Sequence, residues 1–205
     1  MRHLSCLAAI GIMCSVASVA AQQPTKIDPA VVDRYVQATF KGASPEWQAR
    51  IVADEAQRVC SETRGVLTPE QDKKLVELAN SSLVYPADNN VIGDWKKGQQ
   101  LAQRGTGGQF SDQPGGPIGG NCYACHQLSK AELSFGTLGP SLLDYGKIRK
   151  FRPEEAKAAY AKIYNPQAIQ PCSNMPRFGH NKFLNEQDMK DLTAYLFDPA
   201  SPVNK

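Results

Sequence analysis

The sequence predicts an all-α protein in which a helical domain over residues 91–205 follows a smaller helical extension over residues 22–90. Apolar residues recur three and four positions apart in several segments, which is the period of a helix with one buried face. No stretch of useful length alternates between apolar and polar residues, so no strand is predicted. The run Cys122-Tyr123-Ala124-Cys125-His126 lies among the helices of the larger domain and offers a centre around which they can pack.

The first 21 residues have the features of a secretory signal peptide. Arg2 supplies a positive start, and residues 4–20 are apolar apart from small residues. Small residues at the end of this segment predict cleavage after Ala20 or Ala21. The segment is short for a membrane span, although an uncleaved anchor is the alternative. We therefore expect a soluble periplasmic protein that does not enter the membrane.

Length and charge limit the functions that this chain can have. The 205 residues carry a formal net charge of +3, and loss of the one charge of Arg2 with the signal leaves +2. The mature chain of about 184 residues suits one domain plus an extension. So small a charge gives no reason to expect nucleic acid or an acidic membrane surface as a partner.

The extension is predicted to contain helices but no catalytic constellation. The first helix carries apolar residues at helical spacing: Val31, Val32, Tyr35, Val36 and Phe40. A second helix is predicted with Ser44 as its N-cap and Pro45 in its first turn, and its apolar residues are Trp47, Ile51, Val52 and Val59. Thr68-Pro69-Glu70-Gln71 begins a third, whose apolar side is Leu75, Val76 and Leu78. Residues 85–90 are the predicted linker.

The domain over residues 91–205 is predicted to hold helices at about 93–104, 153–164 and 185–197, the last capped by Asn185. Gly98 lies inside the first of these, where a glycine costs up to about 1 kcal/mol relative to alanine. Close approach of another helix would compensate for this cost. Seven glycines and two prolines between residues 105 and 120 predict a surface loop that leads to the cysteine motif.

Cys122-Tyr123-Ala124-Cys125-His126 is the attachment signal for a c-type haem. Two thiols three positions apart can reach the vinyl groups on one porphyrin edge, and the following imidazole can then bind the iron. A redox dithiol and half of a zinc site are the rival interpretations of Cys-x-x-Cys. The directly following His126, with no second Cys-x-x-Cys in the chain, favours one covalently bound haem c.

Of the other four cysteines, two lie inside the predicted signal peptide and two lie outside it. Cys6 and Cys14 leave with it, so that Cys60 and Cys172 are an even pair in an oxidising compartment. Compartment and parity predict a disulfide between these two, and two free thiols are the alternative.

The iron bound by His126 needs an opposite ligand or stays open to small molecules. Met175, Met189 and His180 are the candidates that remain after signal removal. Met189 shares a helical face with leucines, which is typical of a core residue. His180 is a rival, although a solvated or hydrogen-bonded loop histidine explains it better than ligation does. Met175 lies in a proline-flanked loop, which suits a thioether ligand, so we predict Met175 together with His126 as the metal ligands.

The sequence resembles the class I cytochrome c family. Gly98 and Leu101–Ala102 match the first helix of that fold, and Leu192-x-x-Tyr195 matches the last, where the two helices cross closely. Gly139-Pro140 is similar to a Gly-Pro turn of the family. The resemblance implies a class I cytochrome c-like haem domain in which the carbonyl of Pro140 accepts a hydrogen bond from His126 and so orients the ligand.

A more specific resemblance, over about residues 91–205, is to the SoxX family, the monohaem subunits of SoxAX cytochromes. It rests on the segment Cys172-Ser173-Asn174-Met175-Pro176-Arg177-Phe178-Gly179-His180, the segment 138–142 and the ending at residues 196–204. SoxAX complexes oxidatively join thiosulfate to a cysteine of the carrier SoxYZ. The resemblance implies a heterodimer with a SoxA-type haem subunit, which holds the catalytic haem.

On this resemblance, the chain is the electron-relay subunit of a heteromeric L-cysteine S-thiosulfotransferase. It passes electrons to a small cytochrome c, and it has no catalytic residue of its own. Arg177 and Lys182 line an anionic entrance or are solvated surface charges. The alternatives to this function are a free-standing periplasmic monohaem cytochrome c electron carrier unrelated to thiosulfate, and a ligand-binding sensor with an open iron.

Overall fold

The computed structural model describes residues 27–108, 112 and 115–205. The predicted signal peptide, with Cys6 and Cys14, lies outside them. The described residues are helical or irregular and contain no strand, which confirms the all-α prediction. Within the same residues, every helix is too short or too polar to cross a membrane.

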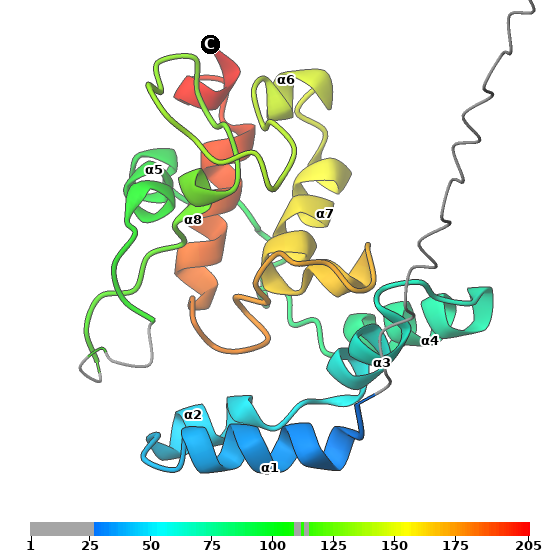
Figure 1. Cartoon of the computed structure of the whole chain (residues 1–205). Coiled ribbons are helices and arrows are strands. Elements are labelled where there is room, and N and C mark those ends of the chain that lie inside the picture. Colours follow the sequence, from blue (N-terminus) through cyan, green and yellow to red (C-terminus); the bar gives the residue numbers. More distant parts are fainter. Residues whose placement is uncertain (1–26, 109–111, 113–114) are drawn as a thin grey trace, which may run out of the picture.

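Figure 1 shows the helices in chain order, coloured from blue at the N-terminal end to red at the C-terminal end. The α-helices are α1 (Pro29–Thr39), α2 (Pro45–Ile51), α3 (Glu55–Thr63), α4 (Pro69–Ser81), α5 (Trp95–Gln103), α6 (Tyr145–Ile148), α7 (Pro153–Tyr164) and α8 (Glu186–Phe197). The short 3₁₀ helices are η1 (Cys122–Ala124), η2 (Pro166–Ala168) and η3 (Pro202–Asn204).

The predicted second helix of the extension is two helices, and this part of the prediction was wrong. The chain leaves the helical conformation at Val52, and α3 begins after Asp54. The Asp54 carboxylate accepts from Gln57 N, while the Gln57 side chain accepts from Asp54 N. This capping box satisfies amide groups at the start of a helix and so favours a new helix over continuation of α2.

The start of α4 follows the predicted signal. Thr68 caps the helix through a capping box with Gln71. Leu75 is buried as expected, whereas Leu78 is exposed and Ala79, one position further on, is buried. Tyr85, in the predicted linker, stacks on Tyr160 of α7, so the linker packs against the domain.

Helices α5 and α8 cross in contact with each other, and Figure 1 shows them next to one another. Gly98 of α5 is buried at the crossing, and a Cβ at this position would collide with the backbone carbonyl of Asp191 and with Tyr195 of α8. Gly93 approaches the same part of α8, and its N–H donates to Lys190 O at 3.0 Å. The helix–helix contact explains why a glycine is present inside α5.

We expect Gly98→Ala to lower the free energy of unfolding by about 1–3 kcal/mol, because the added methyl group overpacks a contact formed by backbone. Denaturant unfolding followed by far-UV circular dichroism measures the change. Gly42→Ala is the matched control, since a Cβ at Gly42 would have no neighbour within 4 Å. Equal stability of the two variants would contradict the close crossing.

The core of the domain is formed by α5, α7 and α8 together with the last residues of the chain. Its buried apolar members include Ala102, Leu128, Ala156, Ala159, Tyr160, Ile163, Leu184, Met189, Leu192, Tyr195, Leu196, Phe197 and Val203. Asn185 caps α8, as the sequence predicts, and forms a capping box with Asp188. This capping box determines where α8 begins, and therefore which of its residues face the core.

The C-terminal tail fixes α6, a short helix that the sequence analysis did not predict. The side-chain oxygen of buried Asn204 accepts from Gly146 N and Lys147 N, at 3.0 and 3.1 Å. Its amide nitrogen donates to Leu196 O and Asp198 O, at 3.1 and 2.9 Å. The N-cap residue of α6, Asp144, makes no capping hydrogen bond with its side chain. Asn204 takes this role instead, and it also binds the end of α8.

Candidate haem site

The two motif cysteines and His126 lie on a single tight turn next to the α5–α8 crossing. Cys125 N and His126 N both donate to Cys122 O, at 3.1 and 2.8 Å. Gly120 N donates to Leu101 O of α5 at 2.9 Å, which holds the start of the turn against that helix. Cys122 and Cys125 are free and half-buried, so that both thiols are available on one turn for thioether bonds.

The loop that contains Gly139 and Pro140 contacts the imidazole of His126. Its Nδ1 lies 2.7 Å from the carbonyl oxygen of Pro140. Because a carbonyl oxygen can only accept, Nδ1 carries the proton and Nε2 presents a free lone pair to a metal. A Cβ on Gly139 would collide with the ring, so a glycine is needed for the loop to come this close.

A catalytic dithiol and a zinc site fit these residues poorly. Burial raises the pKa of the Cys122 thiol to about 12, whereas a reactive dithiol needs a lowered pKa. A zinc site would need further ligands beside Cys122 and Cys125. In the part of the chain that the structure describes, no three His, Cys, Asp or Glu side chains gather as metal ligands would. Two thiols and an oriented imidazole on one turn fit covalent haem.

The three candidates for the opposite ligand lie in different surroundings. Met189 is 3% exposed and belongs to the apolar core on α8. His180 is exposed, and its backbone N–H donates to Tyr164 O at 3.1 Å. Met175 is half-buried and packs against the core from an irregular segment. Met175 stays the predicted ligand, because it is the candidate that combines a thioether with a loop position.

Arg177 is not a solvated surface charge, and that interpretation of it was wrong. Its side chain is 11% exposed and lies 2.5 Å from the carboxylate of Asp54 in the extension. Burial raises the pKa of Asp54, but the hydrogen bonds from Gln57 and Arg177 and the positive charge of Arg177 outweigh this and leave the pKa lowered. The sequence carries no signal for this pair, whose members are 123 positions apart. Lys182 is exposed.

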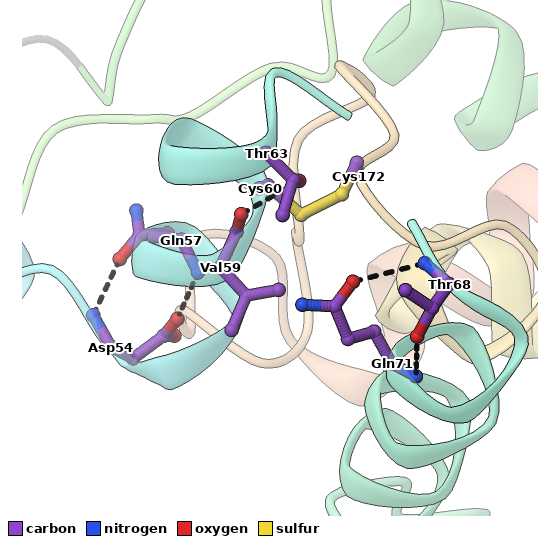
Figure 2. Close-up of a disulfide and its surroundings, with 8 residues drawn as sticks. All are labelled: Asp54, Gln57, Val59, Cys60, Thr63, Thr68, Gln71 and Cys172. Carbon is purple, nitrogen blue, oxygen red and sulfur yellow. Dashed lines mark hydrogen bonds between the residues drawn. A yellow bond between two sulfur atoms is a disulfide. The ribbon is translucent and has the colours of Figure 1, made fainter. Parts of the chain in front are cut away.

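The disulfide between Cys60 and Cys172 is present and joins α3 to the segment that carries Met175 (Figure 2). Its two cysteines are 112 positions apart. Cys172 lies three residues before Met175, so the bond fixes the chain close to the predicted ligand.

A hydrogen-bonded chain of side chains connects the cysteine turn with α5 and α8. The hydroxyl groups of Tyr123 and Tyr195 lie 3.2 Å apart, and Gln103 Nε2 donates to the Tyr123 hydroxyl at 3.2 Å. Burial, followed by the hydrogen bond to Tyr123, raises the pKa of Tyr195. The hydrogen-bonded pair anchors the middle of the Cys-x-x-Cys-His turn to both crossing helices, a role for Tyr123 that the sequence did not indicate.

An all-helical fold in which two helices cross behind a Cys-x-x-Cys-His turn, with the histidine oriented by a backbone carbonyl, defines a c-type cytochrome domain. The comparison with known families agrees. The Cytochrome c family model matches residues 95–198, and the chain belongs to this family. Membership implies covalently bound haem c with iron and electron transfer through it.

A full-length relative extends the comparison to residues before the family match. The chain is 34% identical over 196 residues to an "uncharacterized lipoprotein" of Aquifex aeolicus (strain VF5), which is 95% of this chain and 93% of that protein. An alignment of that length has to run through most of residues 22–90. The extension is therefore a feature of both proteins.

Proposed function

We propose that this chain is the monohaem electron-transfer subunit of a periplasmic SoxAX-type complex. The observation that carries the proposal is the segment 172–180, which resembles the corresponding segment of the SoxX family. The partner would be a SoxA-type haem subunit in a heterodimer. The carrier SoxYZ would present its cysteine to this complex, and a small cytochrome c would accept the electrons.

The residues of the chain have separable tasks in this proposal. Cys122 and Cys125 would hold the haem through thioether bonds, and His126 would bind its iron through Nε2. Pro140 keeps the proton on Nδ1 of the imidazole, which strengthens Nε2 as a ligand. Met175 would be the second protein ligand of the iron, and its thioether would favour the reduced state. Bound haem would supply one-electron redox chemistry at the iron.

The reaction assigned to the complex is an oxidation. A carrier thiol and thiosulfate join through a new S–S bond, and the thiol S–H bond breaks. One proton and two electrons are released. The electrons would pass singly to the small cytochrome, and this chain would hold the group that relays them. The chain itself would have no nucleophile in this step, and its contribution to the transferase would be electron relay.

The periplasmic location is part of the same proposal. It is supported by the signal-like residues 1–21 and by the description of the Aquifex relative as a lipoprotein, which is an exported class of protein. Covalent attachment of haem to such motifs takes place outside the cytoplasm. One Cys-x-x-Cys-His run in the sequence supports one haem.

The test is purification of the tagged chain from cells grown on thiosulfate, followed by haem staining and the mass of each subunit. We expect a second, larger haem subunit at equal stoichiometry, and loss of thiosulfate oxidation when the gene is deleted. A stable monomer whose deletion leaves thiosulfate oxidation unchanged would contradict the proposal and favour a free-standing electron carrier.

A further inference from the structure

The N-terminal extension contacts the distal segment, which we define as residues 165–184, at both ends and in the middle. At its start, Asn165 Nδ2 donates to Ser82 Oγ at 3.2 Å, and Asn80 Nδ2 donates to Ala168 O at 3.1 Å. Figure 1 shows α3 and α4 next to this gold-to-orange part of the chain. The start of the distal segment is thus bound by α4.

The strongest connections lie on either side of Met175. The disulfide to Cys60 fixes Cys172, three residues before it (Figure 2). The Asp54 carboxylate pairs with Arg177, two residues after it. Asp54 also caps α3, the helix that carries Cys60, so both connections start from one short, capped helix. The extension is therefore connected to the chain on both sides of Met175, the predicted ligand.

The end of the distal segment is held by α2. The guanidinium of Arg50 donates to Asn181 O at 2.9 Å and lies over the ring of Phe183, with its carbon 4.2 Å from the ring centre. Trp47 packs against the same phenylalanine edge to face, at 5.8 Å between ring centres. Cation–π and aromatic contacts of this kind add to the area that they bury.

The distal segment has little regular structure of its own to keep Met175 in place. Between η2 and the start of α8 it contains turns and bends but no helix. Within the domain, Gly179 N and His180 N donate to Tyr164 O, which closes the base of the segment. Fixing an irregular backbone costs roughly 1–2 kcal/mol per residue, so contacts from outside are needed to hold it in one conformation.

We propose that the N-terminal extension is a clamp that positions Met175 for the haem iron, with Asp54 and the Cys60–Cys172 disulfide as its positioning residues. The inference rests on the proposed role of Met175 as iron ligand. A methionine thioether is an uncharged ligand that binds iron weakly, so its occupancy depends on the position of the loop that carries it. Loosening the clamp therefore releases the thioether before the domain unfolds.

Asp54→Asn is the sharpest test, because asparagine is also a good N-cap and preserves the start of α3 while it removes the charge that faces Arg177. In the oxidised haem protein, we expect the weak far-red sulfur-to-iron absorption to disappear at a lower urea concentration than the far-UV circular dichroism. In the reduced protein, we expect carbon monoxide to bind about tenfold faster, because loss of a hydrogen bond to a charged group loosens the segment that holds the thioether and leaves the iron open more of the time.

Asp33→Asn is the matched control. It removes the same charge from the extension and breaks the 3.0 Å ion pair with Arg58, but Arg58 does not belong to the distal segment. This variant should behave as the unchanged protein in both measurements. A second variant, in which Cys60 and Cys172 are both replaced by serine, should show the same early loss of far-red absorption as Asp54→Asn.

The outcomes separate the two proposals. If the unchanged protein shows the far-red absorption, and it disappears together with the circular dichroism signal in both Asp54→Asn and the serine variant, the clamp is wrong while methionine ligation stands. If the unchanged protein lacks this absorption, Met175 is not the ligand and the clamp has nothing to position. Early loss in the two clamp variants but not in Asp33→Asn supports the proposal.

Discussion

Replacement of both Cys60 and Cys172 by serine is expected to lower the free energy of unfolding of the haem protein by about 4 kcal/mol, because the disulfide closes a loop of more than 100 residues. Most of this stabilisation comes from restricting the unfolded chain, and it therefore does not depend on local contacts around the sulfur atoms. Urea unfolding followed by far-UV circular dichroism measures it.

A Ser61→Ala variant is the control for this measurement, since Ser61 is an exposed neighbour of Cys60 on the same helix. Its stability should stay within about 0.5 kcal/mol of the unchanged protein. A loss below about 1 kcal/mol in the double serine variant would contradict the prediction, and so would a mass showing that the two thiols are free in the unchanged protein.

Met175→Ala is expected to abolish the far-red sulfur-to-iron absorption of the oxidised protein and to open the reduced iron to carbon monoxide. The loss of a thioether ligand should also lower the reduction potential, because His/Met ligation raises it relative to ligation by stronger donors. Absorption spectroscopy, stopped-flow binding of carbon monoxide and a potentiometric titration measure these three effects.

Two variants control for the other candidates. Met189→Leu conserves volume in the core, so it should retain the far-red absorption and cost less than about 1.5 kcal/mol of stability. His180→Ala should also keep the absorption, since His180 is exposed. Persistence of the absorption in Met175→Ala would exclude Met175, and its loss in Met189→Leu would assign the ligand to α8.

The sequence predicts best what is determined by neighbouring residues. The capping boxes of α4 and α8 lie within four consecutive residues each, and both helices begin where these signals stand. The haem motif is local in the same way, because the spacing of its cysteines and histidine alone determines whether they can bind one haem. Gly98 is a favourable case of another kind, where an unfavourable residue inside a helix indicated a close contact.

Features that depend on distant residues could not be predicted. Arg177 has the sequence environment of a surface charge, and its burial results from Asp54, far away in the extension. Helix α6 receives its cap from Asn204, 58 positions later. The split between α2 and α3 was missed although its capping box is local, because an apolar spacing continuous through Val52 favoured one helix.

The intact mass of the exported, purified chain tests whether a haem is bound covalently at this site. We predict a coloured protein whose mass exceeds that of the processed polypeptide by one haem, with the haem retained after denaturation because it is bound to Cys122 and Cys125. A colourless chain at the mass of the polypeptide alone would contradict the haem site and every function proposed from it.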